Sequence, residues 1–152
     1  MGTGEKRRMK IAKEFRWEMG HRLQCHKGKC YNLHGHSYKL LVEFSGGIED
    51  NGMVLDYFDV KEIVGPIVEE LDHAVIIYNK DTALLEAIKN LNSAHVVVNF
   101  ESTAENLCRY FLKKIKEAKL PSNITDIMVK VYETENTYAE ESVCLIDYSN
   151  HD

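Results

Sequence analysis

Alternating apolar and polar residues predict β-strands at both ends of the chain. In the first such segment Ile11, Phe15 and Trp17 share one parity and charged residues take the other, which is typical of a strand with one buried face. A Ser-Gly-Gly turn ends the second segment. The predicted strands cover residues 9–17, 36–44, 95–100, 124–133 and 142–148. Residues 19–32, between the first two strands, are predicted to form a loop.

Apolar residues at helical spacing predict helices between these strands. The first helix covers residues 58–71 and contains Pro66, which we expect to kink or divide it. A shorter helix covers residues 80–93. A third begins where Ser102 and Glu105 form a capping box, and it ends before the next proline. This order of elements favours an α+β fold, with helices on one face of an antiparallel sheet.

Composition fits a single domain. The 152 residues are 44% hydrophobic, enough for one core and too few for two. We expect residues 1–8 to be a flexible tail or a cloning remnant, and residues 9–152 to form the domain. The chain has no apolar run long enough for a membrane span and no secretory signal, so a cytoplasmic protein is expected. A net charge of -5 argues against nucleic acid or an anionic membrane as the main partner.

The segment CYNLHGH places a thiol beside two imidazoles and predicts a metal site. If residues 34–44 are extended, His34 and His36 project from the same face of a strand. A preceding strand that ends near His21 would supply a third imidazole. Three neutral histidines leave one position of a tetrahedral Zn²⁺ open, which is the arrangement of catalytic zinc.

Two other interpretations of this segment remain open. The histidines can be exposed strand residues without a ligand. Alternatively, Cys25 and Cys30 join His34 and His36 in a closed structural zinc site. Finger histidines are usually three to five residues apart, whereas Gly35 alone separates these two, so the open site is preferred.

Three further features carry possible chemistry. The neighbouring Asp72 and His73 suit a proton relay, or they are a polar pair at a helix end. Glu133 shares the parity of the apolar residues before it, so its carboxylate either points inward toward a cationic partner or is solvated past the core. Basic residues flank the metal motif and suit either a polyanionic substrate or a solvated loop: Arg16, Arg22, Lys27 and Lys29.

Six segments in order resemble the family of 6-pyruvoyl- and 6-carboxy-tetrahydropterin synthases. They are FRWEMGHRL, CYNLHGHSY, GMVLDYFDVK, LDH, STAEN and VYET. The resemblance implies the T-fold, or tunnelling fold, in which a four-stranded antiparallel sheet carries two helices on one face. It also implies a homo-oligomer, either a hexamer or a tetramer, with active sites between subunits.

The resemblance also implies a role for each motif residue. It makes His21, His34 and His36 the zinc ligands and Cys30 the base that abstracts a proton. Asp72 and His73 correspond to the proton relay. Residues that bind the pterin would be Glu133, Thr103 and Glu105. Where the family usually has proline in Pro-Thr-x-Glu, this chain has Ser102.

The spacing between the cysteine and the first histidine separates branches of this family. Three residues lie between Cys30 and His34. This spacing is similar to that of the bacterial 6-carboxy enzymes, which act in queuosine synthesis. The implied activity is a zinc-dependent lyase that converts 7,8-dihydroneopterin triphosphate to 6-carboxy-5,6,7,8-tetrahydropterin, acetaldehyde and triphosphate. A 6-pyruvoyl synthase and a non-catalytic zinc-stabilised binding domain remain the alternatives. The segment 80–100 is longer than in compact family members.

Overall fold

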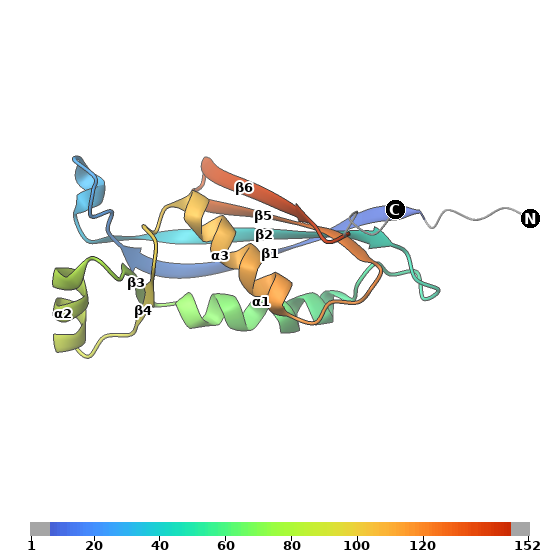
Figure 1. The fold of residues 1–152 in the computed structure, drawn as a ribbon, viewed down its shortest axis with the longest axis horizontal. Helices are drawn as coiled ribbons and strands as arrows, with labels where there is room; N and C mark the ends of the chain where they lie inside the picture. The colour runs from blue at the N-terminus through green and yellow to red at the C-terminus, as the bar shows by residue number, and fades with distance from the viewer. Residues whose placement is uncertain (1–6, 147–152) are drawn as a thin grey trace, which may run out of the picture.

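Four antiparallel strands form the centre of the protein in a computed structural model that describes residues 7–146 (Figure 1). They pair in the order β1-β2-β5-β6. The alternation that predicted them buries one face of β1, β2 and β5, as at Trp17, Leu40 and Val131, and leaves one face of β6 half-buried. The bounds are β1 (Arg8–His21), β2 (His34–Gly47), β5 (Ile124–Thr134) and β6 (Thr137–Cys144).

A β-α-β unit extends this sheet beyond β1. Strand β3 (Ala74–Tyr78) runs parallel to β1, and β4 (His95–Val98) runs parallel to β3. Helix α2 (Thr82–Asn90) connects these two strands and packs Leu84 and Ile88 on Ile77 in a small core of their own. The sheet therefore has six strands in the order β4-β3-β1-β2-β5-β6.

Two longer helices cover the same face of the sheet and enclose the main core. Helix α1 (Tyr57–Leu71) packs on β1, and α3 (Ala104–Glu117) packs on β5 and β6. The ring of Trp17 stacks on Tyr38 and meets Phe111 of α3 edge-on, which ties the sheet to the helix layer. In the described part of the chain, no helix is long and apolar enough to cross a membrane.

The structure confirms the α+β class and corrects the number of elements. The four antiparallel strands and two covering helices are those expected. The structure exceeds the four strands and two helices that the resemblance implied, through β3, β4 and α2. Of these, α2 and β4 confirm the predicted helix 80–93 and strand 95–100, and only β3 was not predicted. Residues 74–78 (AVIIY) were not predicted as a strand, since a short apolar run without alternation has no period that identifies it. Helix α1 continues through Pro66 without division.

Other predicted boundaries also move. Strand β1 runs to His21, so the predicted loop 19–32 begins later, and it contains the short 3₁₀ helix η1 (Lys29–Tyr31). Strand β6 begins at Thr137 instead of residue 142. The end of the predicted strand 142–148 and most of the predicted tail, residues 1–6, lie outside the described residues. Arg8, the last residue of that tail, is the first residue of β1.

Candidate metal centre

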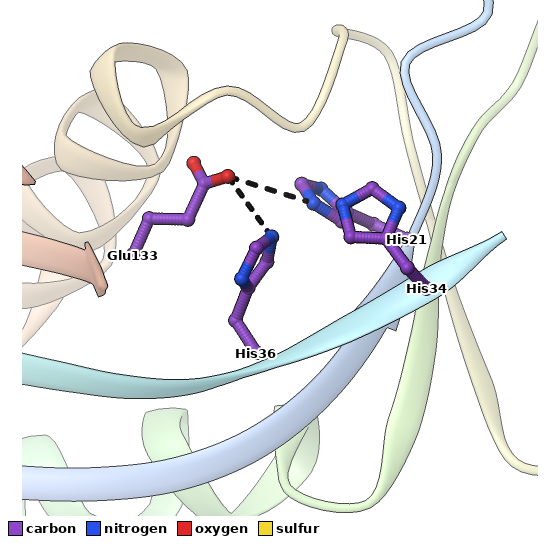
Figure 2. A group of neighbouring side chains, drawn as sticks. All are labelled: His21, His34, His36 and Glu133. Carbon is purple, nitrogen blue, oxygen red and sulfur yellow. Dashed lines mark ion pairs between the residues drawn. The ribbon is translucent and has the colours of Figure 1, made fainter. Parts of the chain in front are cut away.

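Two neighbouring strands bring the three predicted histidines together at one end of the sheet (Figure 2). His21 ends β1 opposite His34, the first residue of β2, and His36 lies two residues further on. All three side chains share the parity of the buried Trp17 and Tyr38. The ring centroid of His21 is 4.7 Å from that of His34 and 5.2 Å from that of His36, and those of His34 and His36 are 4.8 Å apart.

Hydrogen bonds on the far side of two rings fix how they present their nitrogens. The Nδ1–H of His21 donates to Ser102, whose carbonyl and hydroxyl oxygens lie 3.1 Å and 3.0 Å away. The Nδ1–H of His34 donates to the carbonyl of Asn32 at 2.6 Å. In both rings the Nε2 lone pair is therefore left for a ligand, which is how metal-binding histidines are usually oriented.

The electrostatics favour the neutral form of His21 and His36. His21 is fully buried, and burial, together with His34 and His36, lowers its pKa to about 4. Burial also lowers the pKa of His36, although Glu133 opposes that shift. The Nε2 of His36 is buried and faces the carboxylate of Glu133. Imidazoles whose Nε2 atoms converge in this way fit a divalent metal ion.

Glu133 completes this group from the end of β5. Its Oε1 lies 3.0 Å from Nε2 of His36 and 3.9 Å from Nε2 of His21 (Figure 2). One ligand atom from each of the four side chains lies within 4.8 Å of the others, so the group could hold a metal ion. The carboxylate of Glu133 therefore points inward toward His36 and His21, and is not solvated past the core.

The thiols are separate from this group. Among residues 7–146, no group that could hold a metal ion includes Cys25 or Cys30, and so the geometry does not support the closed Cys₂His₂ site. Cys25 is exposed. Cys30 is half-buried in η1 and precedes His34 in the chain, and its backbone carbonyl accepts a hydrogen bond from Leu23.

Asp72 and His73 form a contacting pair where α1 ends and β3 begins. The Oδ1 of Asp72 lies 2.9 Å from Nδ1 of His73 and accepts a hydrogen bond from the backbone N–H of Glu18 at 2.9 Å. That backbone bond, followed by the contact with His73, lowers the pKa of Asp72. His73 has a φ of 60°, a conformation that costs energy outside glycine and is frequent at functional sites.

This pair is not part of the histidine group of its own chain. His73 borders a shallow hollow of about 290 Å³ that Gly20, Gly35 and His36 also line. The two glycines have the opposite parity to His21 and His34, which places their part of the hollow on the other face of the sheet. A β-carbon at Gly35 would lie 3.2 Å from the carbonyl oxygen of Met19, which explains why a glycine separates the two histidines of the motif.

The predicted capping box is wrong by one residue. Thr103, not Ser102, is the N-cap of α3, and its hydroxyl accepts a hydrogen bond from the backbone of Asn106. Glu105 is exposed in the first turn. Ser102 is buried because it contacts His21 instead.

Sequence reasoning missed two other residues, Tyr38 and Asp81. Tyr38 is buried below the histidines, with its hydroxyl 3.5 Å from Nε2 of His21. Burial, together with Glu133, raises its pKa. Arg22, one of the basic residues considered for a polyanionic substrate, is instead bonded to the buried carboxylate of Asp81. No local pattern reveals that pairing, because 58 residues separate the two in the sequence.

The fold and this group of side chains define an α+β protein of the tunnelling-fold class with a candidate metal site at the end of its sheet. Comparisons with known proteins agree. The family model described as 6-pyruvoyl tetrahydropterin synthase matches residues 10–143. The chain belongs to the 6-pyruvoyl tetrahydropterin synthase family.

Curated relatives and solved structures extend this result. A 6-carboxy-5,6,7,8-tetrahydropterin synthase from Haemophilus influenzae is 35% identical over 86% of this chain and 96% of its own length. The protein of the same name from Aquifex aeolicus is 33% identical over 86% of this chain and 95% of its own. The 6-pyruvoyl tetrahydropterin synthase structure from Plasmodium falciparum has a TM-score of 0.74 at 22% identity, over 91% of this chain and 99% of that one. This last likeness concerns the fold.

Proposed function

We propose that this protein is a zinc-dependent 6-carboxy-5,6,7,8-tetrahydropterin synthase that acts in queuosine synthesis. It would convert 7,8-dihydroneopterin triphosphate to 6-carboxy-5,6,7,8-tetrahydropterin, acetaldehyde and triphosphate. The observation that carries the proposal is the group formed by His21, His34, His36 and Glu133, whose ligand atoms lie within 4.8 Å of one another. It occurs in a chain whose relatives bear that enzyme's name.

The metal of this proposal is Zn²⁺, held by His21, His34 and His36. Three imidazole ligands with a further open position are typical of catalytic zinc. When bound there, zinc acts as a Lewis acid toward oxygen atoms of the substrate side chain. The protein supplies the orientation of the ligands, because Ser102 and Asn32 hold the outer nitrogens of His21 and His34.

Cys30 is the proposed base that removes a carbon-bound proton from the substrate side chain. Asp72 and His73 are the proposed proton relay, in which the carboxylate 2.9 Å from Nδ1 orients the imidazole. Since this pair borders the face of the sheet opposite the histidine side chains, we propose that it serves the metal site of a neighbouring copy. The working form would then be a tetramer or hexamer with active sites between subunits.

Three further residues are proposed to bind the pterin. The carboxylate of Glu133 would accept paired hydrogen bonds from the guanidine-like edge of the ring, which places the reacting carbons beside the metal. Its position 3.0 Å from His36 supports a role at this site. Thr103 and Glu105, at the start of α3, would line the same pocket.

The test is to incubate zinc-loaded protein with 7,8-dihydroneopterin triphosphate and to identify the products by mass spectrometry. A 6-carboxy pterin with equimolar acetaldehyde would establish the proposal. A 6-pyruvoyl product would assign the protein to the other branch of the family, and no turnover at full zinc occupancy would refute both enzymes. The His34→Ala variant is the matched control, because it should lose both the metal and any turnover.

A further inference from the structure

The loop that carries Cys30 has little of its own to hold it in place. Residues 22–33 include no buried side chain, and Gly28 gives η1 no side-chain cap. The backbone hydrogen bonds inside the loop are local, such as those from Leu23 to the carbonyl of Cys30 and from His26 to that of Leu23. A segment with so few buried contacts opens at low energetic cost unless another element holds it.

An ion pair connects this loop to the β-α-β unit. The Nε and Nη2 atoms of Arg22 lie 2.6 Å and 2.5 Å from the two carboxylate oxygens of Asp81. Only 1% of the Asp81 surface is exposed. A two-point guanidinium–carboxylate contact of this kind fixes orientation as well as distance.

Asp81 is itself held in place on two sides. It is the N-cap of α2 and accepts a hydrogen bond from the backbone of Leu84 at 3.3 Å. Its own backbone N–H donates to the carbonyl of Tyr78 at the end of β3. Because α2 packs on β3 through its own small apolar core, the carboxylate is attached to a rigid support.

The other side of the guanidinium contacts the residue next to Cys30. The Cζ atom of Arg22 lies 5.0 Å from the ring centroid of Tyr31, within the range of a cation–π contact. Tyr31 and Cys30 are adjacent in η1, so a ring held against Arg22 restricts the backbone that carries the thiol. A continuous series of contacts therefore runs from α2 through Asp81, Arg22 and Tyr31 to Cys30.

We infer that Arg22 and Asp81 are positioning residues that hold the Cys30 loop against the β-α-β unit in the geometry needed for proton abstraction. This inference rests on the proposed function for its catalytic consequence. The structural part does not, because the order of the loop can be measured without turnover. The inference also gives the segment 80–100 a role, since that segment supplies the carboxylate.

The main test uses Asp81→Asn in the zinc-loaded protein. Asparagine is also a good N-cap, so α2 should persist while the charged two-point contact is lost. We expect amide hydrogen exchange in residues 23–33 to become at least about tenfold faster, as local opening becomes easier. We expect kcat to fall by at least about tenfold with KM within twofold, because a misplaced base impairs the chemical step and not binding. Zinc content should not change.

Three further variants separate positioning from general damage. Arg22→Lys keeps the charge but not the planar fork, so it should give the same pattern and provides the test if Asp81→Asn fails to fold. Asp126→Asn removes the carboxylate of an exposed ion pair with Arg8 and should alter neither exchange in the loop nor kcat. In a Cys30→Ala background, Asp81→Asn should not reduce the residual rate further, because the thiol through which it acts is gone.

The outcomes are distinct. Unchanged exchange in residues 23–33 together with an unchanged kcat would overturn the inference. Faster exchange without a change in kcat would overturn the catalytic part, because the loop would then be held for another reason. If the wild-type protein shows no turnover at all, the proposed function fails, while the exchange measurement still decides whether Arg22 and Asp81 hold the loop.

Discussion

Removing the hydroxyl of Ser102 tests whether the outer hydrogen bond of His21 contributes to the metal site. In Ser102→Ala the hydroxyl oxygen, 3.0 Å from Nδ1 of His21, disappears, whereas the carbonyl oxygen at 3.1 Å remains. Loss of an outer partner typically weakens metal binding by about 10- to 100-fold. Because one acceptor survives, we expect the lower end, with the zinc Kd raised about tenfold, or ~1.4 kcal/mol.

The assay is zinc competition against a chelator of known affinity, with unfolding of the metal-free protein measured in parallel. The surviving carbonyl bond should limit the loss of unfolding free energy to about 1 kcal/mol. Ser37→Ala is the matched control, since the Ser37 hydroxyl bonds to Glu18 and should leave the Kd unchanged. A Kd within twofold of wild type for Ser102→Ala would show that the hydroxyl does not orient His21, and the reasoning would fail.

Three further predictions concern the same site. Glu133→Gln should retain zinc and raise KM about tenfold or more, through the lost charged hydrogen bonds; zinc loss measured by elemental analysis would make Glu133 a ligand. Cys30→Ala should retain zinc and reduce kcat by about 10²-fold or more, as removal of a general base does. Loss of zinc from the purified variant would contradict the assignment of Cys30 as the base. For His21 the folded pKa of about 4 lies below the usual 6.5, so the unfolded chain binds the extra proton first. The metal-free protein should therefore lose up to about 3 kcal/mol of unfolding free energy as the pH falls from 6.5 to 4. Denaturant titrations of the His21→Asn variant should lack this pH-dependent loss.

The sequence predicted the antiparallel strands and the positions of the histidines because these features are local. Alternation with a period of two identifies a half-buried strand, and the same period places His34 and His36 on one face. A strand ending at His21 then had to neighbour β2 for three imidazoles to meet. The structure shows that pairing in direct register with His34.

The sequence could not predict contacts between distant segments. Strand β3 has no alternation to reveal it, because it lies inside the sheet with apolar residues on both faces. The contact of Ser102 with His21 joins residues 81 positions apart. Ser102 and Thr103 are both residues that can cap a helix. Thr103 is the N-cap of α3, whereas the Ser102 hydroxyl contacts His21. Parity left two orientations open for Glu133, inward or solvated, and its closeness to His36 depends on the strand order.

The separation of the Asp72–His73 pair from the histidines leads to a prediction about assembly. If the pair serves a neighbouring copy, a site needs Cys30 from one chain and His73 from another. The variants Cys30→Ala and His73→Ala should each be inactive alone. After they are unfolded together and refolded at equal amounts, a random site would combine both intact residues in about a quarter of cases.

The mixture should therefore regain about a quarter of wild-type activity. The measurement is the rate of product formation before and after mixing, at equal zinc content. As a control, the double variant Cys30→Ala/His73→Ala is mixed with wild type. The activity of that mixture should equal the fraction of sites in which both residues come from wild-type chains, and should not exceed it. If the two single variants stay inactive when mixed, while each still binds zinc, then both residues act within one chain. The pair Asp72–His73 would in that case serve the site of its own chain and not that of a neighbouring copy.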